Sequence, residues 1–367
     1  MTKQVWKIER FSADKTSDVM SFTYSTGRRT QFDSWSPGGL VLTIKNESNQ
    51  ADGYNLNDKI ILTAVGTLYF QYFFVQEVLF NDLGGDGAGS TATVICTDLL
   101  GRLGRIQVFE ESISSAGTCI QLYNEFSSLM PTGTFITAYG DGDSTAAADA
   151  SYSGTGLNRF NLNMLTEQGL ILVTTNYIDL FSRSFVAIFA GQRVTFAREA
   201  GVFQLGYSDI KRIALGQNYL NTCTVTPPTA AAQNATNSAG VATYGTYGAE
   251  FATVDNSQAQ ALSFAEWQVY SRDDPDELSF QISISDTANN LTDFFDLVVF
   301  TPVHLVSYKK PGSATPVSTT QIIQGWSMSV NPSRTDIEVF TSPLTYTNFF
   351  TLDSDTFGVL DQSRLGW

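Results

Sequence analysis

The chain has little charge and almost no histidine. Asp, Glu, Lys and Arg make up 16% of its 367 residues, and His304 is its single histidine. One histidine cannot supply a zinc site that needs several imidazole ligands, and a Ser–His–Asp triad would have to use His304. Because residues 303–306 have the character of a strand, we expect His304 to be a hydrogen-bonded strand residue and not a catalytic base.

Other signatures of an enzyme are missing as well. The sequence contains no Gly-x-Ser-x-Gly elbow, no P-loop and no dinucleotide-binding fingerprint. The acidic runs 82–86 and 141–144 are similar to the start of a calcium loop, but neither continues to the glutamate that closes an EF-hand loop. We interpret both runs as flexible acidic loops and predict a non-enzymatic protein with no metal site and no cofactor.

Cysteine and long apolar runs are also scarce. The three cysteines, Cys96, Cys119 and Cys223, are odd in number and far apart, which favours free thiols over a disulfide framework. No run approaches the roughly 18 consecutive apolar residues of a transmembrane helix, so we expect no membrane span. The polar start of the chain predicts no secretory signal.

Acidic residues outnumber basic ones. The 36 acidic and 21 basic residues give a net charge of −15. A face that binds nucleic acid needs basic side chains against the phosphates, so this balance argues against such a face. An acidic wall, past which nucleic acid moves without adhering, is compatible with it.

The chain is rich in aromatic residues and in alternating patterns. Its 26 Phe and 15 Tyr, together with many Gly, Ser and Thr, favour sheets joined by turns. Residues 278–285 alternate strictly between apolar and polar, which indicates a strand with one buried face. The strands predicted at the two ends of the chain are 5–8, 22–25, 40–44, 58–62, 70–81, 91–98, 278–285, 296–300, 322–331 and 336–341.

Two stretches, 40–98 and 278–343, repeat the same order of elements. Each has a short strand, a polar loop, an Asp followed by an apolar run, a long strand that ends in Asn, a turn and a closing strand. We interpret them as two copies of one small β-barrel. The alternative is that any two β-rich stretches look alike at this level.

The middle of the chain has helical periodicity. Apolar residues three and four apart predict a helix over 119–130 with Ser114 or Ser115 as its N-cap, and another from 157 that is ended by Gly169. A third helix is predicted over 257–270, capped by Asp255 or Asn256. Strands are predicted over 170–175, 186–189, 210–215 and 219–226, and a loop over 227–245.

Several motifs occur in an order that is known from one family. They are Phe22-x-Tyr24-x-x-Gly27-Arg28-x-x-Gln31-Phe32-Asp33, Gly39-x-x-Leu42-Thr43-Ile44-x-Asn46, residues 92–105, Glu167-Gln168-Gly169-Leu170, Tyr244-Gly245-Thr246-Tyr247-Gly248, and residues 349–353 and 357–367. The series is similar to minor tail or tail-tip (baseplate) hub proteins of long-tailed bacteriophages. The resemblance also implies a strand pair between 170–174 and 192–196.

The resemblance implies a mainly β fold with α+β inserts, in which two tail-tube-like β-barrels are joined by small α/β domains. The corresponding divisions are 1–109 for the first barrel, 110–206 for an α/β insert, 207–273 for a linking β/α segment with helix 257–270, 274–345 for the second barrel and 346–367 for a C-terminal docking segment.

The family's function is structural. The resemblance implies a homotrimer whose six barrels form a pseudo-sixfold ring, which adapts the sixfold tail tube to threefold tip components and lines the genome-ejection channel. Its expected partners are a tail tube or distal tail protein above, tip, fibre or receptor-binding proteins below, and tape-measure protein or DNA in the lumen. The expected location is the virion tail tip, after assembly in the host cytoplasm. A distal-tail ring, a glycan-binding receptor protein and, less favoured, a cell-wall hydrolase are the alternatives.

Two groups of residues are candidates for the assembly interface. Arg28 and Arg29 precede a turn and are predicted either to pair with acids of an adjacent subunit or to be solvated. The C-terminal segment is too apolar for a free tail, so we expect it to pack on its own barrel or on a neighbour. Its candidate residues are Phe349, Phe350, Phe357 and Trp367.

Overall fold

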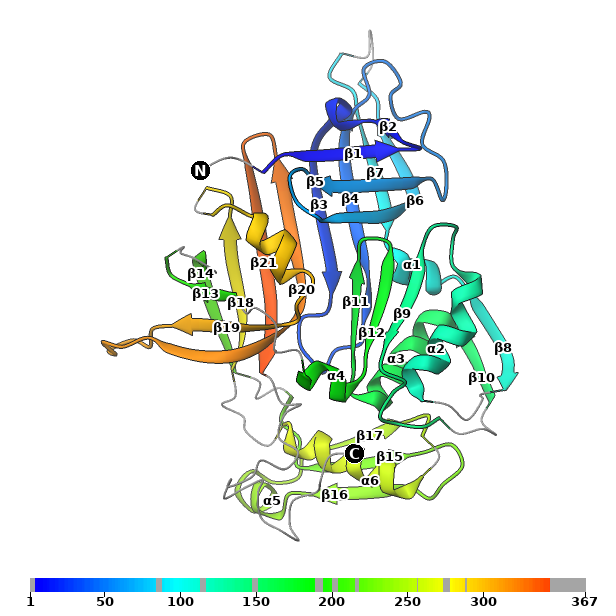
Figure 1. The fold of residues 1–367 in the computed structure, drawn as a ribbon, viewed down its shortest axis with the longest axis vertical. Helices are drawn as coiled ribbons and strands as arrows, with labels where there is room; N and C mark the ends of the chain where they lie inside the picture. The colour runs from blue at the N-terminus through cyan, green and yellow to red at the C-terminus, as the bar shows by residue number, and fades with distance from the viewer. Residues whose placement is uncertain are drawn as a thin grey trace.

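The computed structural model describes residues 4–83, 88–112, 117–146, 151–188, 194–199, 204–214, 218–255, 257–272, 278–287 and 289–343. These residues form two β-barrels beside each other, an α/β unit below the first barrel and beside the second, and a smaller α/β unit at the bottom of the view (Figure 1).

The first barrel is built from the N-terminal strands. Its hydrogen-bonded order is β3-β4-β7-β6-β5-β1-β2, and all of these pairs are antiparallel. The strands are β1 Trp6–Arg10, β2 Ala13–Asp14, β3 Val19–Gly27, β4 Ser36–Lys45, β5 Lys59–Ala64, β6 Phe70–Asn81 and β7 Thr91–Thr97, with a short 3-10 helix at Thr16–Asp18. Alternation places Leu40, Leu42 and Ile44 inside, each fully buried.

The second barrel has the order β14-β18-β21-β20-β19-β13, and a parallel pairing of β13 with β14 closes it. Its strands are β13 Thr195–Ala197, β14 Gln204–Ala214, β18 Leu278–Ser285, β19 Val303–Tyr308, β20 Val317–Asn331 and β21 Arg334–Pro343. A π-helical turn, η4, spans Phe294–Val298 between β18 and β19, and its buried residues Phe294, Phe295 and Val298 belong to the shared hydrophobic core.

The two barrels are copies of one topology. If β3, β4, β5, β6 and β7 are matched with β14, β18, β19, β20 and β21, the order and direction of pairing are the same. The registers also match, because the long strands β6 and β20 each bulge at one glutamine, Gln76 or Gln324, against the closing strand. A second bulge lies near the start of both β3 and β14. The predicted duplication is thus present as two barrels in one chain.

The copies differ at their sixth strand. In the second barrel β13 runs parallel to β19 and pairs with β14, so the barrel is closed. In the first, β1 is antiparallel to β5, and β3 pairs with β20 of the second barrel over 22–27 and 325–330. One 13-stranded sheet therefore runs through both barrels.

One hydrophobic core also joins the barrels. The Trp6 ring makes edge contacts with Phe22 of the first barrel and Phe295 of the second, with centroids 5.4 and 5.2 Å away. Its Nε1 donates a hydrogen bond of 3.2 Å to the Thr335 hydroxyl. The barrels are consequently one packed unit.

Below the first barrel lies an α/β unit. A sheet has the order β11-β12-β9, helix α2 packs on β9, helix α3 packs on α2 and β10, and β8 pairs separately with β10. The elements are α1 Leu99–Leu103, β8 Gln107–Ser112, α2 Thr118–Phe126, a 3-10 turn at Ser127–Leu129, β9 Phe135–Tyr139, β10 Ser151–Thr155, α3 Gly156–Glu167, β11 Leu170–Thr174, β12 Tyr177–Phe181 and α4 Arg183–Ile188.

The second small unit lies at the bottom of Figure 1. Its sheet has the order β16-β15-β17, and α6 packs on β15 and β16. The elements are β15 Thr222–Thr226, β16 Gln233–Thr236, α5 Ser238–Tyr244, β17 Gly248–Ala252 and α6 Gln258–Tyr270.

Several sequence predictions need correction. Residues 296–300 were predicted as a strand but belong to η4 and the turn after it, and β19 takes the predicted strand's place. Residues 186–189 were predicted as a strand, whereas α4 continues to Ile188. The predicted pairing of 170–174 with 192–196 is also wrong, because β11 pairs with β12 and β13 joins the second barrel.

The helix ends differ in detail from their prediction. Gln168, with φ 57°, takes the left-handed position at the end of α3 that was predicted for Gly169. Ser257 caps α6 through its hydroxyl, in place of Asp255 or Asn256. Gly117 occupies the N-cap of α2, and Ser114 and Ser115 lie outside the described residues.

The division of the chain into five segments stays a prediction. In the structure, β13 and β14 are hydrogen-bonded into the second barrel, although they fall within the predicted insert and linking segments. The three cysteines are buried free thiols. No helix within the described ranges is long and apolar enough to cross a membrane.

Candidate assembly and channel surface

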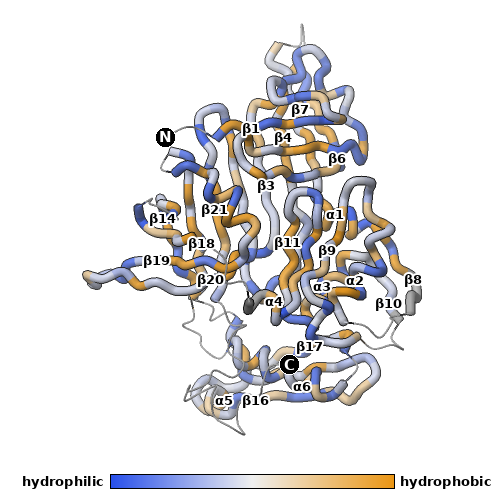
Figure 2. Tube along the Cα trace, in the orientation of Figure 1, coloured by the Kyte–Doolittle hydropathy of each residue, from blue (hydrophilic) through white to orange (hydrophobic). Residues whose placement is uncertain are grey.

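A polar face runs across both barrels on the side of the sheet away from the core. It follows the strand order β14-β18-β21-β20-β3-β4-β7-β6. Figure 2 shows hydrophobic and hydrophilic residues mixed along these strands. We call the outward residues of these strands the polar face; its central members are Thr23, Ser25, Val41, Thr43, Thr93, Ile95, Gln281, Ser283, Ser327, Ser329, Asp336 and Glu338. A hollow of about 580 Å³ lies on this face and touches strands of both barrels.

The polar face is close to neutral. Its charged residues on the described strands are Glu77, Asp209, Asp336 and Glu338 against Lys45, Lys211 and Arg334. Arg334 pairs with Asp336 at 2.6 Å, and Gln281 donates to Glu338. Hydroxyl groups, and not carboxylates, therefore dominate this surface.

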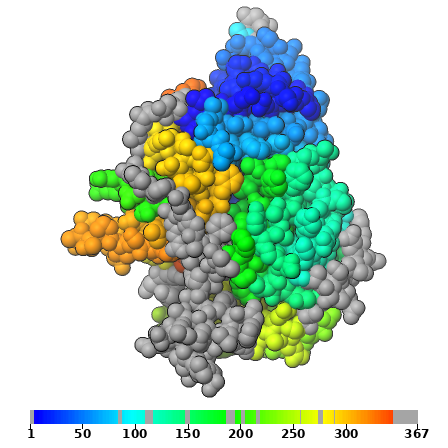
Figure 3. Space-filling view, in the orientation of Figure 1, coloured from blue at the N-terminus to red at the C-terminus, as the bar shows by residue number. Residues whose placement is uncertain are grey.

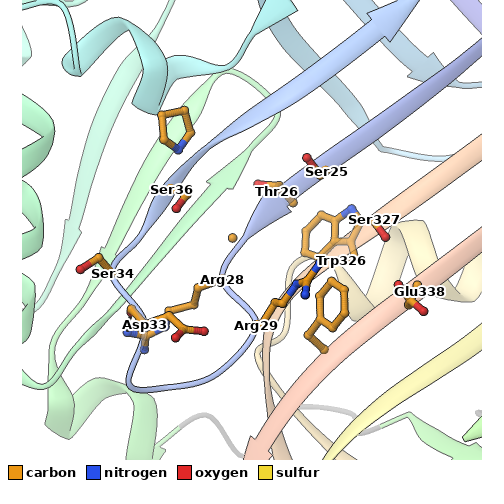
Figure 4. Close-up of a pocket in the computed structure, with 13 residues that line it drawn as sticks. Ser25, Thr26, Arg28, Arg29, Asp33, Ser34, Ser36, Trp326, Ser327 and Glu338 are labelled. Atoms are coloured by element: carbon orange, nitrogen blue, oxygen red, sulfur yellow. Dashed lines mark hydrogen bonds between the residues drawn. The ribbon is translucent and has the colours of Figure 1, made fainter. Parts of the chain in front are cut away.

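Beside the junction of β3 and β20 lies a second hollow of about 420 Å³ that contains both predicted arginines (Figure 4). The Arg28 Nε donates to Gln324 Oε1 at 2.8 Å, and its guanidinium lies 4.2 Å from the Trp35 ring centroid. Arg29 lies over Phe340 at 5.7 Å. The structure thus gives Arg28 partners within the chain, while pairing of either arginine with a neighbouring subunit stays a prediction.

Two strands of the continuous sheet, β6 and β14, each have one edge that is open along most of its length. Beyond Val75, which still exchanges backbone hydrogen bonds with residues 57 and 58, no described strand pairs with β6 on the edge that faces away from β7. Beyond Gly206, β14 is likewise unpaired on its edge away from β18 over the residues that the structure covers. These two edges correspond, through the repeat, to the edges of β20 and β3 that pair within the chain.

Large apolar side chains lie exposed along these open edges. Leu79 and Phe80 of β6 are 48% and 49% exposed, and Ile213 of β14 is 41% exposed. Phe80 is on the core-facing side of its strand, yet its counterpart Met328 is 2% exposed because β3 covers it. An open edge with apolar side chains favours pairing with another strand.

Two buried carboxyl groups fix the local structure beneath these surfaces. Asp98 is the N-cap of α1, and its Oδ1 accepts from the Gly101 N–H at 3.1 Å. Burial raises the pKa of Asp98 to about 7, although backbone hydrogen bonds act in the opposite direction.

Glu167 holds together four parts of the α/β unit. Its Oε1 accepts from the backbone N–H of Asp143 at 2.8 Å and of Arg183 at 3.1 Å. Its Oε2 accepts from the Ser144 N–H at 3.0 Å and the Thr118 hydroxyl at 2.5 Å. Burial raises the pKa of this carboxyl, while the hydrogen bonds lower it. The Glu of the quoted Glu-Gln-Gly-Leu motif therefore has a structural role.

The other residues that the sequence singled out are His304, the acidic loops and the C-terminal aromatic residues. His304 is fully buried in β19, where Nδ1 accepts from the Val194 N–H at 3.2 Å and Nε2 lies 2.5 Å from the Thr301 carbonyl. In the described part of the chain, no group of three His, Cys, Asp or Glu residues could hold a metal. Phe349, Phe350, Phe357 and Trp367 lie outside the described residues.

Sequence reasoning missed Leu79, Phe80 and Ile213. For Leu79 and Ile213 the signal was available only in part, because an apolar residue on the polar face of a strand is unusual but not diagnostic, and Phe80 gave no signal because it lies on the core-facing side. The partner of a strand edge is decided by the tertiary fold, which the local pattern does not contain.

No protein-family model matches this chain, and no curated protein matches its sequence. Solved structures do match its fold over nearly all of its length. A tail protein from Neisseria meningitidis superposes with a TM-score of 0.65 at 8% identity, covering 94% of this chain and 99% of that one. The 43 kDa tail protein of prophage MuSo2 from Shewanella oneidensis gives 0.59 at 10% identity, covering 94% and 100%.

A third similar structure is an E. coli component of the type VI secretion system, which is described as structurally similar to the T4 bacteriophage tail proteins gp27 and gp5. It superposes with a TM-score of 0.57 at 9% identity and covers 92% of this chain and 76% of that one. This chain therefore shares its fold, two β-barrels of one topology with two smaller α/β units, with these tail proteins.

Proposed function

We propose that three copies of this chain form a ring at the tip of a phage tail and serve there as a structural, non-enzymatic hub. The six barrels of such a ring would be arranged with approximate sixfold symmetry. A sixfold tail tube or distal tail protein could then dock above, and threefold tip, fibre or receptor-binding components below.

The proposal is supported most by the two open strand edges, on β14 and β6, because they are equivalent to the edges of β3 and β20 that pair within the chain. Within the chain, β3 of the first barrel pairs with β20 of the second. The equivalent edges, β14 of the second barrel and β6 of the first, are open and lie at opposite ends of the eight-stranded run. Repeating the internal junction between chains pairs β14 of one copy with β6 of the next.

The register of this pairing follows from the repeat. Ser327 of β20 lies opposite Ser25 of β3. Their equivalents are Leu79 and Ile213, so the two exposed apolar side chains meet across the new junction. On the other side of the strands, Phe80 would lie opposite Arg212, and a guanidinium over an aromatic ring is a favourable contact.

The polar face would then line a closed channel. Its basic and acidic side chains nearly balance, so this hydroxyl-rich surface has neither an excess of positive charge that would retain a polyanion nor a strong acidic field. The sequence predicted an acidic wall, and the described residues of this face do not carry that excess. Tape-measure protein or DNA is the proposed content of the lumen, and the virion tail tip, after assembly in the host cytoplasm, is the proposed location.

Sedimentation velocity of the purified chain over nanomolar to high micromolar concentrations tests the proposal, with a trimer as the expected species and a ring of approximate sixfold symmetry in negative-stain images. Leu79→Lys should raise the concentration at which trimers dissociate, and a second change, Ile213→Asp, should restore assembly. Leu129→Lys is the control, because Leu129 is 50% exposed but lies in the α/β unit. A chain that stays monomeric up to high micromolar concentration, with or without tail-tube protein, would refute the hub.

A second candidate function has one observation in its favour. Tyr244 and Tyr247 of the small lower unit are 53% and 51% exposed, and both rings pack edge-on against Tyr219. Exposed aromatic rings of this kind suit stacking on sugars, as in a glycan-binding receptor protein. Binding of the wild-type chain to a glycan array, lost on Tyr244→Ala, would favour this function.

A further inference from the structure

A second contact joins the two barrels within the chain, away from the strand junction. The turn between β5 and β6, residues 65–69, reaches η4 of the second barrel. The Leu68 N–H donates to Asp296 Oδ1 at 2.7 Å, and the Tyr69 ring lies 5.1 Å from Phe295. A loop tip of one barrel thus rests on the connection between the first two strands of the other.

Both halves of this contact have counterparts in the opposite barrel. The turn equivalent to 65–69 is the connection of β19 to β20, residues 309–316. The η4 turn lies in the connection from β18 to β19, and the equivalent connection in the first barrel is the loop between β4 and β5, residues 46–58. In one isolated chain these two counterparts do not meet, because the β19–β20 hairpin projects away from the body (Figures 1 and 3).

The two counterparts have opposite charge. Lys309 and Lys310 are exposed at the start of the projecting turn, and neither forms an ion pair with a described residue. In the loop over 46–58, Glu47 and Asp52 are exposed, and Asp52 likewise has no ion pair among the described residues. The chain has only 21 basic residues against 36 acidic ones, so two adjacent exposed lysines stand out.

The acidic loop is held in a fixed shape that suits a docking surface. The Ala51 N–H donates to Asn46 Oδ1 at 3.0 Å, and the Asn55 N–H donates to Asp58 Oδ2 at 2.7 Å. Asp58 also pairs with Arg10 at 2.7 Å. Leu56, on the same loop, is 61% exposed and offers an apolar contact beside the acids.

We infer that the basic tip of the β19–β20 hairpin docks on the acidic β4–β5 loop of a second copy of this chain. The inference rests on the proposed trimer, since it applies the internal barrel-to-barrel contact a second time, between neighbours. It assigns Lys309 and Lys310 to the hairpin side and Glu47, Asp52 and Leu56 to the loop side. Because the pairs are exposed, salt weakens the contact.

Zero-length carbodiimide cross-linking of the assembled wild-type chain tests the contact directly. The experiment uses a mixture of ¹⁴N- and ¹⁵N-labelled chains that has been dissociated and reassembled. We expect amide links between Lys309 or Lys310 and Glu47 or Asp52 that carry both labels, which establishes that they join different copies. Trimers that yield other cross-links but none of these would overturn the inference and leave the hub intact, whereas absence of trimers contradicts the hub itself.

Charge variants give an independent measurement. Lys309→Gln/Lys310→Gln should raise the concentration at which trimers half-dissociate by roughly threefold to tenfold, as expected for a few exposed ion pairs. Ala239→Glu/Ala242→Glu, on the exposed face of α5, changes the net charge by the same amount and serves as the control. Equal dissociation of both variants, at low and at high salt, would rule out the lysine contact.

Discussion

Asp98 provides a quantitative test of the structure, because its carboxyl is buried at the N-terminus of α1, directly after the closing strand of the first barrel. Burial raises its pKa from 3.8 to about 7. Between these values the folded chain binds a proton at Asp98 that the unfolded chain does not bind. The contribution of this group to stability is therefore fully present below about pH 4, falls as the pH rises towards 7 and is lost above it.

The size of the effect follows from the shift in pKa. A change of this size corresponds to at most about 4 kcal/mol of unfolding free energy. Asp98→Asn removes the charge and keeps an oxygen that can accept from the Gly101 N–H, so the cap is retained. We expect the variant to be about as stable as the wild type at pH 4 and more stable by about 2–4 kcal/mol at pH 8.

Urea unfolding of both proteins at several pH values between 4 and 8 measures this difference. The two proteins are compared at each pH because burial also raises the pKa of Asp179, to about 6, and that of Glu167. These two groups are present in both proteins, so their effect on the unfolding free energy cancels in the difference. Asp141→Asn changes an exposed acid and is the matched control. A wild-type-minus-variant difference that does not change with pH would refute a buried, protonated Asp98.

Three further predictions concern packing. Glu167→Gln should lower the unfolding free energy by about 2–4 kcal/mol, because an amide cannot accept all four hydrogen bonds of the buried carboxylate; denaturant unfolding against Glu250→Gln, at an exposed glutamate, measures this. Gly325→Ala should lower the unfolding free energy by about 1–3 kcal/mol, since a Cβ there would lie 2.4 Å from the Thr26 carbonyl oxygen. Gly39→Ala is the control in the same thermal-unfolding assay, because a Cβ at Gly39 has room. Trp6→Ala should cost about 3–5 kcal/mol by removing the ring between Phe22 and Phe295, and separate melting of the two barrels in calorimetry would show that they had become uncoupled; an unchanged melting profile would contradict the shared core.

The alternating strands could be predicted from the sequence because one of their faces is buried. The bounds of β6 and β18 agree with the prediction at both ends. In β18 apolar and polar residues alternate strictly, whereas β6 is a long run rich in aromatic and β-branched residues. The repeat was predictable for the same reason, as order and spacing survive where sequence identity does not.

Residues 296–300 show where this reasoning fails. A short apolar run has no period that separates a strand from a buried turn. Here Phe294, Phe295 and Val298 pack into the shared core as part of a π-helical turn. The pairing predicted between 192–196 and 170–174 failed for a different reason, because β13 is hydrogen-bonded to β14 and β19 of the second barrel.

The candidate interface could be predicted only in part. Arg28 and Arg29 are placed in one hollow by the structure, but their neighbours Gln324 and Phe340 come from the far end of the sequence. The edges of β6 and β14 are open because of the strand that is added beside β5 or β19, which is β1 in the first barrel and β13 in the second. This pairing is between residues far apart in the sequence, so the pattern of a single strand does not predict it.

The pairing of β3 with β20 also has a consequence for the order of events during synthesis. The outer edge of β3 has no partner until β20, which ends at Asn331, has been translated. The hydrogen bond from Trp6 Nε1 likewise cannot form before Thr335 has been translated. The first barrel therefore cannot complete its core while the chain is still growing on the ribosome. A prematurely terminated product that lacks β20 would leave the outer edge of β3 unpaired, and exposed strand edges and apolar surface of this kind favour aggregation and chaperone binding.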